Sequence, residues 1–82
     1  MIAGIWRTPR ANRDDDLFNR FKSTPGIVAT YQLANDKEIV VVTIWESAEK
    51  RDTYMKSTLQ TEIAAANPAA SRGAYELINS RT

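Results

Sequence analysis

With 82 residues, eleven of them basic and ten acidic, the chain has room for a single domain spanning residues 1–82 and carries a net charge of only +1, which gives no indication of nucleic-acid binding. The absence of cysteine and histidine excludes disulfides, the usual zinc and haem ligands and a histidine general base, so a metal site would need oxygen ligands. Because so short a chain buries only about 60–65% of its surface, we expect it to gain stability by oligomerisation.

The amino-terminal third predicts a strand and a short helix. Ile2–Thr8 begins with an apolar run and is followed by Pro9, which is typical of a strand and its end. A helix should begin after Asp14 as N-cap and end before Pro25-Gly26, with apolar residues at helical spacing: Leu17, Phe18 and Phe21. Asp14-Asp15-Asp16 would also suit a cation, but acids in a first helical turn are already favoured by the helix dipole.

The rest of the chain predicts a hairpin, a long helix and a last strand. Ile27–Leu33 and Glu38–Trp45 are rich in β-formers and are separated by the turn residues Asn35-Asp36-Lys37. One helix is expected from the N-cap Ser47 to Ala66, where Asn67-Pro68 stops it, with its apolar stripe formed by Ala48, Met55, Leu59, Ile63 and Ala66. Gly73–Ile78 is expected to be the fourth strand.

This order predicts an α+β fold of the ferredoxin-like βαββαβ type: a four-stranded antiparallel sheet with two helices on one face. Residues of both parities in Glu38–Trp45 are apolar, so both faces of the sheet need covering. Two helices cover one face only. We therefore expect Val40, Val42 and Ile44, or else Val41, Thr43 and Trp45, to be covered by a second copy in a homodimer. An RNA-binding domain of the same order would carry aromatic and basic residues on this strand instead.

The segment Val41-Val42-Thr43-Ile44-Trp45-Glu46-Ser47 resembles the third strand and following helix start of the dimeric α+β barrel superfamily, in particular of antibiotic biosynthesis monooxygenase-like proteins. Pro25-Gly26-Ile27 and Tyr75-Glu76-Leu77 also resemble that superfamily, so the similarity covers nearly the whole chain. The resemblance implies a dimeric α+β barrel formed through the sheet faces. It also implies either an oxygenase or a member without known activity.

Two branches of the superfamily allow a comparison of residues. The cofactor-free monooxygenases use a Trp at the position of Trp45, but here Val41 replaces their Asn, Arg51 replaces their Tyr, and alanines occupy the region of their Arg. The haem-degrading branch resembles Thr43–Ser47 but ligates iron through a helical His that this chain lacks. That branch also uses an Asn on the first strand and a Trp on the second helix. Here Trp6 or a neighbour stands in place of the Asn, and Tyr54 stands in place of the Trp. We therefore expect no bound cofactor and no metal.

By parity with the superfamily, strands one and three and the second helix should contribute side chains to one apolar pocket. The residues expected to bind a substrate are Trp6, Val41, Trp45 and Met55, and those expected to act chemically are Arg51 and Tyr54. Three of these residues have an alternative interpretation. Trp45 and Trp6 would fill the core, and Arg51 would be a surface arginine paired with Glu49 or Asp52. Tyr31 and Tyr75 are further phenol donors, and Arg7 is a candidate for the dimer interface.

Two functions are compatible with these residues. The first is oxidation of a small planar phenol or quinol without metal or flavin, in which Arg51 stabilises the developing oxyanion while the substrate itself reduces dioxygen. The second is a non-catalytic dimer that binds a small hydrophobic ligand or serves as a scaffold. No segment reaches the ~18–20 apolar residues of a membrane span, and no basic leader precedes Ile2, so we expect a cytoplasmic protein without a membrane partner.

Overall fold

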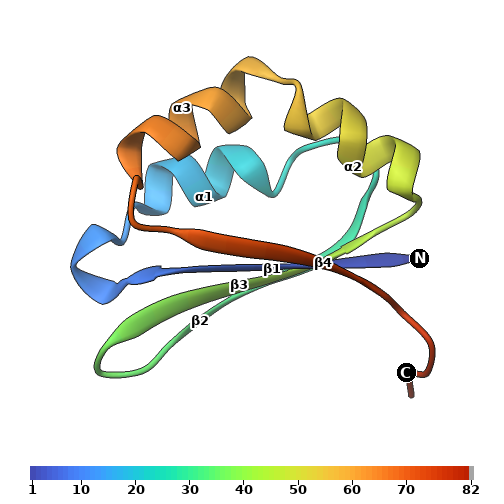
Figure 1. Ribbon diagram of the computed structural model, residues 1–82, viewed down its shortest axis with the longest axis horizontal. Coiled ribbons are helices and arrows are strands. Elements are labelled where there is room, and N and C mark those ends of the chain that lie inside the picture. Colours follow the sequence, from blue (N-terminus) through green and yellow to red (C-terminus); the bar gives the residue numbers. More distant parts are fainter. Residues whose placement is uncertain (82) are drawn as a thin grey trace.

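The computed structural model describes residues 1–81. Its elements are, in chain order, β1 (Ile2–Pro9), the 3-10 turn η1 (Arg10–Asn12), α1 (Asp15–Phe21), β2 (Ile27–Ala34), β3 (Glu38–Trp45), α2 (Ala48–Met55), α3 (Thr58–Ala66) and β4 (Ser71–Glu76). The strands form one antiparallel sheet in the order β2-β3-β1-β4. All three α-helices lie on the same side of this sheet (Figure 1). The predicted α+β ferredoxin-like fold is therefore confirmed.

The first helix begins as predicted. The side chain of Asp14 accepts a hydrogen bond from the backbone N–H of Leu17 at 3.1 Å, so Asp14 is the N-cap of α1. Asp15 and Asp16 follow in the first turn, where their charges favour the helix. Leu17 is buried against the sheet side of the helix. The three aspartates thus start a helix, and no group of three metal-binding side chains forms anywhere in residues 1–81.

The single helix expected from Ser47 to Ala66 is wrong, because the chain forms two helices there. Ser47 caps α2 as predicted, but α2 ends at Met55 and Ser57 caps a new helix by accepting a hydrogen bond from the N–H of Gln60 at 3.2 Å. A serine followed three residues later by glutamine is the sequence signature of a capping box. This capping signal marks the break between the two helices in the sequence. The break was missed because the apolar residues on both sides of it were assigned to one continuous helix. The sheet is therefore covered by three helices rather than two.

The fourth strand is displaced from its predicted position by two residues. It runs from Ser71 to Glu76, whereas Gly73–Ile78 was expected, and Ile78 lies beyond the strand with 86% of its surface exposed. The apolar residues Leu77 and Ile78 suggested the later end, but the register with β1 sets the actual one. As a result Arg72 belongs to the strand, opposite Trp6.

The turn between α1 and β2 is fixed to the second helix through Gly26. This residue has φ of +93°, a conformation that side chains rarely adopt, and a Cβ built on it would lie 2.6 Å from the Cβ of Lys50. Its carbonyl accepts a hydrogen bond from the N–H of Glu46 at 2.8 Å. Only glycine therefore allows the turn, the end of β3 and the start of α2 to pack so closely.

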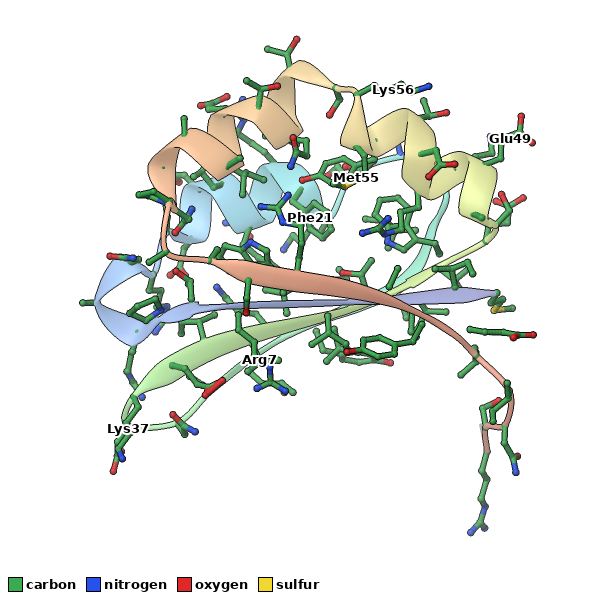
Figure 2. All side chains as sticks on the ribbon, in the orientation of Figure 1. Arg7, Phe21, Lys37, Glu49, Met55 and Lys56 are labelled. Atoms are coloured by element: carbon green, nitrogen blue, oxygen red, sulfur yellow. The ribbon has the colours of Figure 1, made fainter. Side chains whose placement is uncertain are left out.

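The two faces of β3 have different surroundings. Ile39, Val41, Thr43 and Trp45 are buried beneath the helices, whereas Val40, Val42 and Ile44 face the opposite side and are only partly buried. Figure 2 shows the same division: Phe21 and Met55 lie in the layer between helices and sheet, and Arg7 lies beneath the sheet. We call the side away from the helices the outer face. Large apolar residues remain exposed on it, with Tyr31, Leu33 and Tyr75 each more than half accessible.

No helix within the described residues is long and apolar enough to cross a membrane.

Candidate functional site

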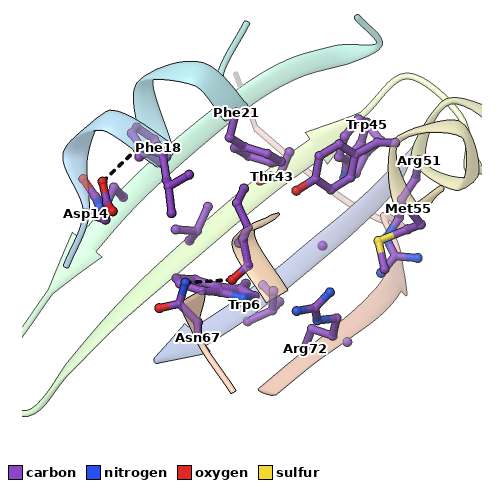
Figure 3. A pocket seen from close by; sticks show the side chains of 18 residues that line it. Trp6, Asp14, Phe18, Phe21, Thr43, Trp45, Arg51, Met55, Asn67 and Arg72 are labelled. Atoms are coloured by element: carbon purple, nitrogen blue, oxygen red, sulfur yellow. Dashed lines mark hydrogen bonds between the residues drawn. The ribbon is translucent and has the colours of Figure 1, made fainter. Parts of the chain in front are cut away.

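A cavity of about 100 Å³ lies between the sheet and the helices (Figure 3). All six residues predicted from the sequence line it, namely Trp6, Val41, Trp45, Arg51, Tyr54 and Met55. They come from β1, β3 and α2, as expected from the parity of the strands. The structure thus brings the candidate residues together, while their chemical roles stay predictions.

Aromatic rings form one wall of the cavity. The ring of Phe21 meets those of Tyr54 and Trp45 edge to face, with centroids 5.1 and 6.1 Å apart and interplanar angles of 72° and 78°. Trp45 and Tyr54 are 5.4 Å apart at 30°. Such pairs add about 0.5–1.5 kcal/mol each beyond burial of their surface. Trp45, at 2% exposure, is therefore both part of the core and part of the cavity wall.

Trp6 contributes a buried donor to the floor of the cavity. Its indole Nε1 is inaccessible to solvent and has no hydrogen-bond partner within residues 1–81. A buried N–H left unpaired costs about 1–3 kcal/mol, which is why such groups in proteins are rare and often belong to binding sites. Trp6 lies in the middle of the sheet, directly between Val41 of β3 and Arg72 of β4. It is the central residue of the cavity floor.

Two nitrogen atoms converge above Gly4, the next residue of β1 on the helix side. A Cβ built on Gly4 would lie 3.4 Å from Nε1 of Trp45 and 3.9 Å from Nε of Arg51. A Cβ at Gly4 would therefore be in van der Waals contact with both atoms, and Gly4, Trp45 and Arg51 all line the cavity. The alternative interpretation of Arg51 as a surface arginine requires an ion pair with Glu49 or Asp52. Among the described residues, Arg51 forms no ion pair with either acid. The guanidinium is thus available to an oxygen atom placed above Gly4.

The Tyr54 hydroxyl stays protonated at neutral pH. Burial raises the pKa of Tyr54 to about 12, and the positive charge of Arg72 acts in the opposite direction. At neutral pH the Tyr54 hydroxyl therefore carries its proton and does not act as a base. Arg72, whose charge lowers the pKa of Tyr54, lines the same cavity.

Several residues of the site were not predicted from the sequence. The expected strand Gly73–Ile78 leaves Arg72 in the preceding loop, and Thr43 was expected only as a packing residue. Both line the cavity. Phe21 was correctly assigned to the first helix, but nothing in the sequence indicated that it would meet Trp45. Conversely, the register places Tyr31 opposite Val42 and Tyr75 opposite Ala3, both on the outer face, so neither belongs to this site.

Comparison with protein-family profiles and with curated protein sequences finds no match. Solved structures do match over nearly their whole length. Rv0793 from Mycobacterium tuberculosis is 14% identical with a TM-score of 0.81, covering 99% of this chain and 98% of its own. SnoaB from Streptomyces nogalater, a cofactor-independent oxygenase, is 17% identical with a TM-score of 0.74, covering 96% and 94%.

A third match is an antibiotic biosynthesis monooxygenase-like protein from Deinococcus radiodurans, 8% identical with a TM-score of 0.75, which covers 100% of this chain and 97% of its own. Identities this low establish similarity of fold and leave activity open. They agree with the fold that the resemblance around Trp45 implied. The chain therefore has the ferredoxin-like α+β fold of antibiotic biosynthesis monooxygenase-like proteins.

Proposed function

We propose that the protein oxidises a small planar phenol or quinol with dioxygen in the cavity, without a bound cofactor. The observation that carries the proposal is the space above Gly4, where Trp45 Nε1 and Arg51 Nε meet beside a wall of aromatic rings. Aromatic walls suit a flat ring, and two N–H groups suit an oxygen that becomes negatively charged. The similarity of fold to a cofactor-independent oxygenase supports the same reaction class.

The reaction needs only the substrate and dioxygen. The phenol gives its proton to solvent, and Arg51 and the Trp45 indole N–H stabilise the phenolate oxygen. The phenolate donates electrons to dioxygen, and a ring carbon forms a bond to oxygen to give a hydroperoxide after protonation. Loss of the ring hydrogen and cleavage of the O–O bond release water, so that phenol and dioxygen become quinone and water. A quinol would instead give a quinone and hydrogen peroxide.

The size of the cavity restricts the substrate. Sites for drug-sized ligands usually measure about 300–1,000 Å³, several times the volume found here. We therefore expect one or two fused rings and not an extended polycyclic system. Met55, which lines the cavity beside Arg51 in Figure 3, has a flexible side chain that can adapt the cavity to rings of different shape.

The proposal is tested with an oxygen electrode and a panel of monocyclic and bicyclic phenols and quinols. We expect oxygen consumption with at least one of them, and a decrease of about tenfold or more in Arg51→Ala, because removing one oxyanion donor commonly has an effect of this size. Arg13→Ala removes the same charge from an exposed ion pair with Asp15 outside the cavity and serves as the control. No oxidation above the buffer rate, with Arg51→Ala equal to the parent, contradicts the proposal.

A non-catalytic ligand-binding protein is the second candidate. Val41, an aliphatic residue, lines the cavity at the position where the resemblance implies an asparagine, and the carboxylate among the lining residues, Asp14, is engaged as a helix cap. Both observations favour binding without turnover. Binding of phenols without oxygen consumption would support this candidate.

We also propose that two copies pack through the outer face. Apolar residues from all four strands are partly or largely accessible there, including Ile5, Val40, Val42, Leu33 and Tyr75. The neighbouring charges neutralise each other, because Arg7 donates to Glu38 at 2.8 Å. A neutral apolar sheet surface is self-complementary, as the interface of a symmetric dimer must be. Its burial would supply the stability that so small a core lacks.

A further inference from the structure

Two arginines of the cavity have no partner in the described chain. The four arginines between residues 7 and 20 are bound to oxygen atoms, since Arg7, Arg13 and Arg20 form ion pairs and Arg10 donates to the carbonyl of Asn35 at 2.7 Å. Arg51 and Arg72 line the cavity, and neither forms an ion pair or a side-chain hydrogen bond within residues 1–81. The cavity therefore carries two unneutralised positive charges.

Arg72 is directed to the helix side by the register of the sheet. It lies opposite Trp6, and residues opposite each other in antiparallel strands share a face. Trp6 in turn lies opposite Val41, so that Arg72 extends the cavity floor toward the edge strand β4. Its charge acts on the Tyr54 hydroxyl, which agrees with this placement.

The carboxylate that lines the cavity lies away from the two arginines. The acid that lines the cavity is Asp14, which Figure 3 shows beside Phe18 at the end away from Arg51, Met55 and Arg72. Its carboxylate already accepts the N–H of Leu17. A neutral phenol would bind to Arg51, and Arg72 would then have only water as a hydrogen-bond partner. A ring that carries a second, anionic oxygen group would engage both.

We infer that Arg72 determines specificity by binding a carboxylate on the substrate ring, while Arg51 binds the hydroxyl, so that the substrates are hydroxybenzoate-type aromatic acids. This inference rests on the proposed function for the location of the ring and goes beyond it in the class of substrate. A guanidinium binds a carboxylate through two parallel N–H bonds, which a neutral amide or ester cannot reproduce. Arg72 is largely exposed, so the preference is moderate in size.

The test measures binding without turnover, by calorimetry under nitrogen, for 2-, 3- and 4-hydroxybenzoate and for the corresponding neutral hydroxybenzamides. We expect at least one acid to bind about fivefold more tightly than its amide in the parent protein. In Arg72→Gln this preference should fall below about twofold, whereas Arg72→Lys should keep part of it. Arg13→Gln, which removes a charge outside the cavity, should keep all of it.

The outcomes separate this inference from the proposed function. A preference for acids that depends on Arg72 supports the inference, even where no oxygen is consumed. Equal binding of acids and amides, a preference that survives in Arg72→Gln, or no binding of any acid up to about 5 mM overturns it, even where neutral phenols are oxidised.

Discussion

Gly4→Ala should weaken binding at the site about 10- to 100-fold while leaving the fold intact. The new methyl group would lie 3.4 Å from Trp45 Nε1 and 3.9 Å from Arg51 Nε, which are ordinary contact distances, and the backbone of Gly4 does not have a positive φ. It would occupy the space that we assign to the substrate oxygen. The same substitution therefore has opposite consequences for stability and for binding.

The magnitudes follow from these contacts. Replacing glycine by alanine in an unstrained conformation stabilises by about 0.4–1 kcal/mol, because the unfolded chain loses freedom. The close approach to Trp45 offsets part of this gain, so the free energy of unfolding should change by less than about 1 kcal/mol. Since 1 kcal/mol corresponds to about 4–8 °C in Tm for a domain of this size, the shift in Tm should be smaller than that. Excluding an oxyanion from two N–H donors should cost about 1.5–3 kcal/mol of binding, which is about 10- to 100-fold in affinity.

Thermal unfolding followed by circular dichroism measures the first quantity, and calorimetry with the tightest-binding phenol measures the second. Gly73→Ala is the control: the backbone of Gly73 borders the cavity, but the added methyl group would point to the outer face, 3.2 Å from the ring of the exposed Tyr75, and should not affect binding. Binding by Gly4→Ala within about twofold of the parent would show that the substrate oxygen does not lie above Gly4, and the proposed mechanism would be refuted.

Three further predictions concern the dimer, the helix break and Tyr54. Val42→Glu places a charge in the middle of the outer face and should convert a dimer into monomers in analytical ultracentrifugation; an unchanged mass would exclude this face as the interface. Ser57→Ala removes the cap of α3 and should lower the stability by about 1 kcal/mol in urea unfolding, whereas Ser80→Ala, outside any element, should not; equal effects would argue against the cap. Because the folded pKa of Tyr54 is raised to about 12 from 10.0, the folded state retains a proton that the unfolded state loses. Stability should therefore fall as the pH rises from 10 to about 12, by more in the parent than in Tyr54→Phe, and parallel pH profiles of the two proteins would contradict the shift.

Local sequence patterns were sufficient for most of the fold. The alternation and run lengths of the β-rich segments predicted four strands in the correct order, and Asp14 and Ser47 were correctly predicted as helix caps. These signals are local, because a cap or a turn depends on a few neighbouring residues. The break at Ser57 was also encoded locally, and it was missed because an apolar stripe was given more weight than a cap.

The candidate site was partly predictable for a different reason. The period of two along a strand places Val41 and Trp45 on one face of the sheet, and the resemblance to the superfamily implied that Trp6 shares this face, as the register of β1 against β3 shows. Which side faces the helices was not decided by the strand itself, because both parities of Glu38–Trp45 are apolar. Only the packing of the helices buried Val41, Thr43 and Trp45 and left Val42 on the outer face.

The sequence alone thus determined the element types, their order and the alternation of each strand. Tertiary structure alone decided the register of β4 against β1, which brings Arg72 beside Trp6. It also decided how α1 approaches β3 and α2, which brings Phe21 against Trp45 and Tyr54. These contacts join residues far apart in the chain, and no short-range pattern records them. Their positions depend on how the whole core packs, because close-packed side chains fit in few arrangements.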